Sequence, residues 1–497
     1  MRDEQTGQSI QLTYNGLPYP RVIREFAHAQ WILDMEIHLM ALETAQAEPH
    51  QAMPQRVAFL LDNLNGGGAE RVVLAMASGF SALGYEVDLL VCELKGELCG
   101  SVPPEVNLVV MEPAGKLAGL VDAVRLGGWR GLGGILFWLA SARKISRCFH
   151  YIRDIRDYLQ KARPAVILSV LGKASISAVL AASRLNIPTR VFVGVQIALS
   201  VRSDQSQRSG KGQTYSMVPM SRYCFPRAHG VIAASRGVAE DAISFLGLDP
   251  ARVHVVYNPV EAAEPEGAPA HPWFLPGAPP VILGMGRLVE QKNFPLLIRA
   301  FAAVRQRVDA RLVILGGDKA SAEQMAHRQE LQDLAVELGV GDDVALLGYQ
   351  SNPNTFLRAA RVFALSSNYE GFGNVLVEAL LAGCPIVSTN CPSGPAEILE
   401  NGQYGMLVPV NDPGSLADAI LASLASEPDV EKLRQRGSEF SLERAVAGYH
   451  RIFFGERSAC VPGELGESSP SKPSSYAIRQ ANGNHKMIHS SLGRVTI

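Results

Sequence analysis

Short apolar segments of strand-like length alternate with helical segments along two stretches of this chain, and this alternation limits the fold more than any other feature. The first stretch predicts strands at 57–62, 87–92, 106–111, 165–171, 189–195, 230–234 and 253–257. The second stretch predicts strands at 281–286, 311–316, 344–348, 362–365, 385–389 and 406–408. Such alternation is typical of parallel, doubly wound sheets. The chain is therefore predicted to be an α/β protein with two Rossmann-like domains that face a cleft.

A segment rich in Pro, Ala and Gly, residues 261–280, separates the two stretches and predicts a linker. The N-terminal Rossmann-like domain is then expected over 53–260, and the C-terminal one over 281–441. The polar tail at 458–497 lacks a pattern of apolar residues that could build a core, so we expect it to be disordered.

Residues 1–52 precede the first predicted strand and allow two interpretations. Residues 21–47 fit one amphipathic helix, so the segment could be a genuine helical addition. Alternatively, Met53 is the true initiator and the preceding residues are an over-extended start. The sequence leaves both interpretations open.

The composition indicates a globular protein without an extreme overall charge. The 497 residues suit two or three domains, with 47% hydrophobic and 19% charged residues. Net charge is −2, but residues 56–252 carry an excess of eight positive charges and residues 259–457 an excess of eight negative ones. No nucleic-acid partner is expected.

The cysteines and the hydropathy favour a cytoplasmic location. Seven cysteines are scattered without a C-x-x-C pair, as is typical of reduced thiols in the cytosol. The N-terminus lacks an apolar signal core, and no apolar run approaches the roughly 18 residues of a membrane span. Any membrane contact is therefore expected to be peripheral, at the inner face of the plasma membrane.

Two carboxylates, Glu370 and Glu378, lie eight positions apart around a glycine-containing turn that leads into an apolar helix. The free N–H groups at such a helix start form a site for an anion. Glu378, just over one turn into the helix, could accept hydrogen bonds from a vicinal diol such as a ribose, and Glu370 could hold hydroxyls of a second sugar. A diphosphate between two polyol-binding carboxylates describes a nucleotide sugar. The alternative is a surface loop before an ordinary amphipathic helix.

This run resembles the E-x7-E motif of retaining GT-B glycosyltransferases, in particular glycosyltransferase family 4, whose members build bacterial surface polysaccharides. The resemblance continues through Leu381 to Thr389, Ser393 to Leu399, and Gly405 to Pro409. It implies that the helical segment 442–457 crosses back to the N-terminal domain.

The departing diphosphate of a nucleotide sugar needs a positive charge, and no D-x-D motif occurs in the chain to hold a metal ion. Arg287 and Lys292 instead follow the first strand of the second domain, beside Gly286. A lone Arg–Lys pair after a strand is usually just solvated. Their place resembles the paired basic residues of the family and implies a diphosphate clamp without metal or cofactor.

The resemblance assigns the remaining site residues. Catalytic roles fall on Arg287, Lys292 and Glu370. The donor, a UDP or GDP sugar, would contact Gly67, Gly68, Gly286, Phe372, Gly373, Asn374, Val375, Leu376 and Glu378. Many relatives carry an E-H-N-like triplet after the strand at 189–195, where this chain has Val195-Gln196-Ile197, so Gln196 is the candidate acceptor-binding residue.

Nine Lys/Arg against two Asp fill the segment 125–163, interspersed with Trp, Phe and Leu. This mixture suits the surface of an anionic membrane, where relatives with polyprenyl-diphosphate sugar acceptors dock. The alternative is a helix pair that packs on the sheet with a solvated basic face.

The prediction is a retaining, metal-independent glycosyltransferase that moves a sugar to a hydroxyl of a glycan, polyprenyl-linked, in surface polysaccharide or glycoconjugate biosynthesis. Two alternatives remain: a GT-B epimerase, and a non-catalytic scaffold that binds sugar nucleotides. An epimerase would need a further acid/base set, which the sequence does not show. A scaffold would have no need of Arg287, Lys292 and Glu370, which are all present.

Overall fold

The computed structural model describes residues 13–14, 17–18, 55–115, 118–127, 147–208, 213–261, 267, 269, 271–317 and 322–455. The chain divides into two units, Met1–Gln55 and Arg56–Ile497. In the first unit, β1 (Thr13–Tyr14) pairs antiparallel with β2 (Leu17–Pro18). The predicted helix at 21–47 and the tail at 458–497 lie outside the described residues.

The second unit contains a seven-stranded parallel sheet with the order β5-β4-β3-β6-β7-β8-β9. Its strands are β3 (Arg56–Leu61), β4 (Glu86–Val91), β5 (Asn107–Val110), β6 (Val166–Val170), β7 (Arg190–Val195), β8 (Gly230–Ala233) and β9 (Val253–Val255). Helices cover it: α2 (Gly68–Ala82), α4 (Ile152–Ala162), α5 (Gly172–Ala182), α6 (Leu199–Arg208), α7 (Gln213–Cys224) and α8 (Arg236–Leu246). Each predicted strand of the first domain is confirmed.

A six-stranded parallel sheet follows along the chain, with the order β12-β11-β10-β13-β14-β15. Its strands are β10 (Val281–Met285), β11 (Arg311–Leu315), β12 (Val344–Gly348), β13 (Val362–Leu365), β14 (Ile386–Thr389) and β15 (Met406–Val408). The surrounding helices are α9 (Phe294–Arg305), α10 (Ala322–Glu337), α11 (Pro353–Ala359), α12 (Asn374–Ala382), α13 (Pro395–Ile398), α14 (Pro413–Ala425) and α15 (Val430–Ser438). The strands predicted for the second domain are confirmed as well.

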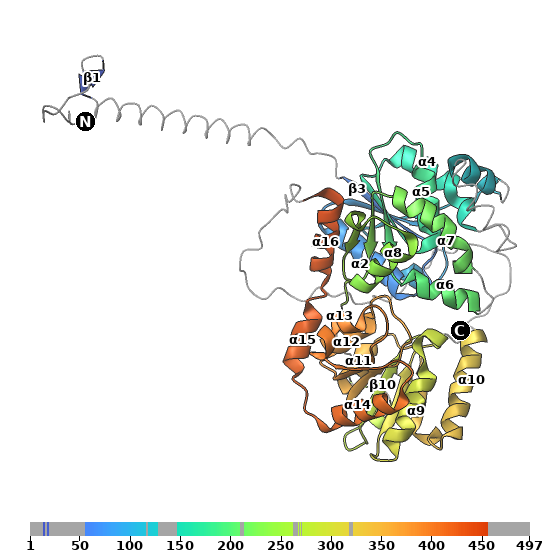
Figure 1. Cartoon of the computed structure of the whole chain (residues 1–497), viewed down its shortest axis with the longest axis vertical. Helices are drawn as coiled ribbons and strands as arrows, with labels where there is room; N and C mark the ends of the chain where they lie inside the picture. The colour runs from blue at the N-terminus through green and yellow to red at the C-terminus, as the bar shows by residue number, and fades with distance from the viewer. Residues whose placement is uncertain are drawn as a thin grey trace, which may run out of the picture. The chain divides into compact units, whose positions relative to one another are not determined.

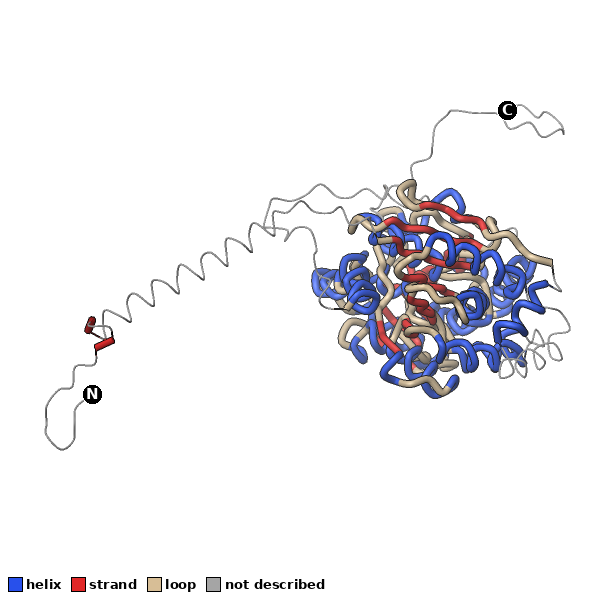
Figure 2. The backbone as a smooth tube through the Cα atoms, turned by 90° about the horizontal axis from the view of Figure 1, so that it is seen from above, coloured by secondary structure: helices blue, strands red, loops and turns tan. Residues whose placement is uncertain are grey.

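Both faces of each sheet are buried, because the strands are apolar on both sides. Along β3, Ala58 and Leu60 belong to one core, whereas Val57 and Phe59 belong to the core on the opposite face. Continuous apolar strands of this kind are typical of parallel sheets. Helices therefore flank the strands on both sides (Figure 2).

The helix α16 (Leu442–Phe454) returns from the second domain and packs in the core of the first, beside α2 (Figure 1). Its Phe453 is fully buried, with ring centroids 5.6 Å from Phe80 of α2 and 5.0 Å from Phe192 of β7. Aromatic pairs at these distances contribute beyond their buried area. The helix thus ties the two domains together through a hydrophobic contact.

A second connection joins the start of α8 in the first domain to α13 in the second. The carboxylate of Glu397 accepts hydrogen bonds from the backbone N–H groups of Arg236 and Gly237, both at 2.9 Å. Ser235, which caps the same helix, donates its hydroxyl to the Gly371 carbonyl at 2.7 Å. A carboxylate of one domain therefore caps a helix of the other.

In each sheet the chain first adds two strands on one side of the sheet's first strand and then continues on its other side, so the strand order reverses once. These reversals lie at β3/β6 in the first domain and β10/β13 in the second. Ligands of doubly wound sheets bind at the carboxyl ends of the strands beside such a reversal. No helix in the described ranges is long and apolar enough to cross a membrane.

Candidate active site

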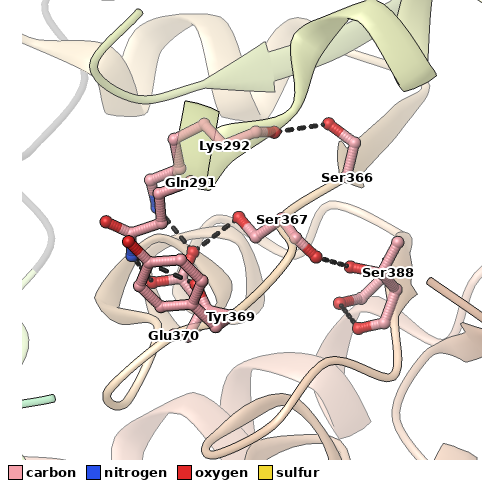
Figure 3. A network of polar contacts seen from close by, with 8 residues as sticks. Gln291, Lys292, Ser366, Ser367, Tyr369, Glu370 and Ser388 are labelled. Atoms are coloured by element: carbon pink, nitrogen blue, oxygen red, sulfur yellow. Dashed lines mark hydrogen bonds and ion pairs between the residues drawn. The ribbon is translucent and has the colours of Figure 1, made fainter. Parts of the chain in front are cut away.

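At the reversal of the second sheet, an ion pair joins the loops that follow β10 and β13. Lys292 Nζ lies 2.7 Å from Glu370 Oε1, and the two side chains are only 12% and 7% exposed. The Ser367 hydroxyl donates to the same oxygen at 2.6 Å, and Gln291 Nε2 lies 3.4 Å from Oε2 (Figure 3). Both carboxylate oxygens therefore have donors, as a buried charge requires.

Hydrogen bonds to backbone carbonyls fix the loops that carry this pair. The Ser366 hydroxyl donates to the Lys292 carbonyl at 2.8 Å (Figure 3). The Asn368 N–H donates to the Gln291 carbonyl, also at 2.8 Å. Thr389, at the end of β14, donates its hydroxyl to the Ser367 carbonyl at 2.7 Å. Loops from three neighbouring strands hold one another, so the pair is preorganised without a ligand.

Gly286 directly follows β10 and makes room for the Lys292 side chain. A Cβ at this position would lie 2.9 Å from Lys292 Cε, and the residue has a φ of 154°. Any larger residue would therefore push the lysine away from Glu370. Arg287, the next residue, is exposed to solvent, so its guanidinium is available to a ligand.

The helix α12 begins beside the Lys292–Glu370 pair, at a turn that contains two glycines. Gly371 packs so closely that a Cβ would overlap the Gln196 carbonyl oxygen of the first domain. Gly373 caps the helix in a left-handed conformation. The Leu376 N–H already donates to the Gly373 carbonyl at 2.8 Å, so that amide is used within the turn.

The starts of α2 and α12, one from each domain, come together. A Cβ on Gly68 would lie 3.4 Å from Asn374 Nδ2, and Asn374 Oδ1 accepts a hydrogen bond of 3.1 Å from Asn258. Helix N-termini carry partial positive charge, and two of them facing the same space favour an anion.

Glu378 lies one turn into α12 and is partly accessible to solvent. Burial raises its pKa, while the positive charges of Arg71 on α2 and of Lys292 lower it. The carboxylate therefore lies near cations of both domains, close to the ends of the two helices.

Two protein-family models match the chain. The model of glycosyl transferases group 1 matches residues 271–440, and that of the glycosyl transferase 4-like domain matches residues 67–259. The match over residues 67–259 covers the first sheet except β3, and the match over residues 271–440 covers the second sheet. The chain has the GT-B fold, and its two domains resemble these two glycosyl transferase models.

Two curated relatives are sugar transferases by name. One, from Campylobacter jejuni, is N-acetylgalactosamine-N,N'-diacetylbacillosaminyl-diphospho-undecaprenol 4-alpha-N-acetylgalactosaminyltransferase, 31% identical over 45% of this chain and 57% of that protein. The other is the lipopolysaccharide core biosynthesis glycosyltransferase LpsE of Rhizobium meliloti, 36% identical over 36% of this chain and 50% of that protein. The chain thus spans about half the length of these relatives.

Among solved structures, Anabaena HepE in complex with UDP-glucose has the same fold. The TM-score is 0.59 at 19% identity, and the match covers 80% of this chain and 98% of that one. The likeness extends over both domains and supports the GT-B fold.

The GT-B arrangement brings most of the predicted site residues together. Lys292 and Glu370 are paired, and Gly67 and Gly68 start the helix that meets Asn374. Two of the predicted donor-binding residues, Phe372 and Leu376, have side chains that are buried in the core of the second domain. Phe372 stacks on Tyr257 with centroids 5.5 Å apart, so only its backbone can face a ligand.

The helix α6 of the first GT-B domain contributes two side chains, Arg202 and Gln205, that were not among the residues predicted from the sequence. Gln205 donates to Glu290 at 3.1 Å and accepts a hydrogen bond from the Tyr369 hydroxyl. Arg202 lies on the same helix, near Tyr369 and Arg287. No sequence motif marks α6 as part of the site. The position of Tyr369 next to Glu370 could have indicated that the Tyr369 hydroxyl has a hydrogen-bond partner.

In the described part of this GT-B protein, no three His, Cys, Asp or Glu side chains gather into a group that could hold a metal ion. Positive charge at the proposed donor site is supplied by Arg287 and Lys292, together with the two helix starts.

Proposed function

We propose that this chain is a retaining, metal-independent glycosyltransferase. It moves a sugar from a nucleotide-diphosphate sugar to a hydroxyl of a polyprenyl-linked glycan in surface polysaccharide biosynthesis. The observation that carries the proposal is the preorganised Lys292–Glu370 pair beside the meeting point of two helix N-termini. The family matches of both domains support it.

In this proposal the diphosphate of the donor binds at the two helix starts. The amides of Gly373, Asn374 and Val375 face the anion, and the exposed Arg287 reaches its oxygens. Lys292 uses one N–H for Glu370 and keeps the others for phosphate. Negative charge grows on the diphosphate as the glycosidic bond breaks, so these donors stabilise the transition state more than the bound substrate.

The two carboxylates hold the sugars at either end of the diphosphate. Glu370 accepts hydrogen bonds from the hydroxyls of the transferred sugar, and its own donors keep it in one orientation. Glu378, partly exposed one turn into α12, accepts the two hydroxyls of the ribose. Both nucleotides, UDP and GDP, satisfy this geometry.

Retention follows when the acceptor hydroxyl attacks from the face that the diphosphate leaves. The departing phosphate oxygen then takes the proton of the acceptor, and the positive groups of the site hold it there. The acceptor approaches from the first domain, where Gln196 lies directly against the turn that carries Glu370. Gln196 is accordingly the proposed acceptor contact.

Peripheral binding to an anionic membrane would bring the enzyme, at the inner face of the plasma membrane, to a lipid-linked acceptor. Two described cations of the basic segment have protein partners: Arg153 pairs with Asp122 at 3.0 Å, and Arg156 donates to the Ala181 and Ser183 carbonyls. Membrane docking would therefore depend on the other cations of the segment, such as the exposed Lys161 and Arg163.

A thermal-shift panel tests the proposal. The full-length protein is melted with UDP, GDP and a set of UDP and GDP sugars, each with excess EDTA and again with Mg²⁺. The proposal predicts a rise in melting temperature with one nucleotide series, equal in EDTA and Mg²⁺, because ligands that bind the native state stabilise it. No shift with any nucleotide, or a shift only with metal, would contradict it.

A further inference from the structure

The reversal point of the first sheet carries charged groups that the proposed donor site does not use. β3 and β6 are parallel neighbours with Leu60 opposite Ser169, so Asp62 and Leu171 leave the sheet side by side. Leu171 has a φ of 75°, a left-handed conformation that a leucine rarely adopts, and it directly precedes α5. Strain of this kind at a ligand-binding edge commonly accompanies function.

Lys173, in the first turn of α5, and Arg202, on α6, both interact electrostatically with Asp62. Within the described ranges, neither cation lies within 4.0 Å of a carboxylate oxygen, and no side-chain hydrogen bond holds Asp62. Loss of solvent nevertheless raises the pKa of Asp62 to about 6 and lowers the pKa of Arg202. Asp62 and Lys173 are half-buried, whereas Arg202 is exposed, so its guanidinium is available to a ligand at this edge of the sheet.

The group is continuous with the donor site. Arg202 lies near Arg287 of the proposed diphosphate clamp and near Tyr369, which precedes Glu370. The neighbouring Gln205 holds both Tyr369 and Glu290. A molecule bound at Asp62, Lys173 and Arg202 would therefore lie next to the donor sugar.

We propose that Asp62, Lys173 and Arg202 form the acceptor subsite and that the acceptor carries a phosphate or diphosphate near its reactive sugar. This inference rests on the proposed function. The two cations come from different elements and bind the phosphate oxygens from two sides, whereas Asp62 accepts a hydrogen bond from a hydroxyl of the acceptor sugar. The positive charge selects against neutral glycans.

Calorimetry with inorganic pyrophosphate tests the subsite, because the same anion could also enter the donor site. The full-length protein is first saturated with UDP, which fills the donor site, and pyrophosphate is then titrated. The proposal predicts one further binding equivalent of pyrophosphate in the presence of UDP. Pyrophosphate that binds only in competition with UDP, or not at all to the UDP complex, would overturn it.

Variants separate the two sites. Lys173→Gln and Arg202→Gln should each weaken pyrophosphate binding to the UDP complex by roughly tenfold, the usual loss for a charge-assisted hydrogen bond. UDP affinity should stay within about twofold of the wild type in both variants. Lys161→Gln, an exposed cation at the end of α4, is the matched control and should change neither.

The outcomes distinguish this inference from the proposed function. Wild-type protein that binds UDP but no further pyrophosphate removes the acceptor subsite and leaves the donor site intact. Wild-type protein that fails to bind any nucleotide contradicts the proposed function itself. Melting curves of each variant establish that the fold survives, and equal pyrophosphate affinity in Lys173→Gln, Arg202→Gln and wild type would overturn the subsite.

Discussion

Lys292 Nζ lies 2.7 Å from Glu370 Oε1, in a setting where both side chains are largely buried. The sequence assigns the lysine to the diphosphate and the glutamate to the sugar, as if the two acted separately. Their contact makes them one unit, because moving either charge changes the environment of the other. Arg287, by contrast, is exposed to solvent. This difference leads to distinct predictions for the two cations.

Arg287→Ala should lower turnover by about 10²–10³, the typical loss when one donor to a developing anion is removed. The melting temperature should stay unchanged, because the side chain is exposed. Lys292→Ala should lose turnover as well but also destabilise the fold by about 3 kcal/mol, since Glu370 is left buried without its counter-ion. Steady-state kinetics and thermal melting measure the two effects, with Arg299→Ala, exposed on α9, as the control. A normal melting temperature for Lys292→Ala would show that the pair is not a structural unit.

Glu378→Gln should weaken UDP or GDP binding by about tenfold, because an amide is a poorer acceptor for two ribose hydroxyls. The substitution keeps the size of the side chain, so α12 should remain intact. Calorimetry with the nucleotide measures the change, and Glu337→Gln, exposed on α10, is the control. If Glu378→Gln binds the nucleotide as tightly as the wild type, Glu378 does not hold the ribose.

Asp62→Asn should stabilise the protein, most strongly at neutral pH. The pKa of Asp62 is raised in the folded state to about 6, so the folded chain prefers the protonated form. Stability is therefore lost as pH rises from about 4 to 6, by up to about 3 kcal/mol for two pKa units. The substitution removes that cost, so the gain in unfolding free energy should be larger at pH 7.5 than at pH 5.

Urea unfolding at the two pH values measures this difference, with Asp204→Asn, an exposed carboxylate on α6, as the control. The same variant should transfer less sugar, because functional sites often give up stability for activity. A variant that loses stability at pH 7.5 would show that Asp62 supports the fold instead.

Glu397→Ala should loosen the connection between the two domains. The carboxylate accepts hydrogen bonds from two backbone N–H groups of α8, and their loss should cost about 1–3 kcal/mol. Small-angle scattering should show a larger radius of gyration, whereas each domain keeps its secondary structure. Glu431→Ala, exposed on α15, is the control. An unchanged radius and melting temperature would mean that the Glu397 hydrogen bonds contribute little to holding the domains together.

The fold was predictable from sequence because its strands are short, apolar on both faces and separated by helices. The β3 segment Val57–Leu61, for example, has no polar residue that could favour another structure. The position of residues 372–378 at the start of a helix was predictable because they follow the glycines of one turn. The Lys292–Glu370 contact was not, since the two residues are 78 positions apart and meet only through the pairing of β10 with β13.

The contacts of α6 are a second feature of the site that could not be predicted from the sequence. Arg202 and Gln205 carry no motif, and their roles depend on where α6 lies relative to Tyr369 of the other domain. Interactions across a domain boundary follow from tertiary packing, which local periodicity does not encode. The contacts of α6 with the second domain therefore emerged only from the structure.

The configuration of the first sugar released from the donor decides whether the enzyme retains the anomeric configuration. The protein is incubated in EDTA with the α-linked nucleotide sugar that gives the largest thermal shift, and early proton NMR spectra follow the slow transfer of its sugar to water. With a retaining, metal-independent enzyme the α-anomer should appear first, the rate should be unaffected by EDTA, and Arg287→Ala should abolish the signal. A β-anomer that appears first, or release that requires a divalent metal ion, would contradict that mechanism.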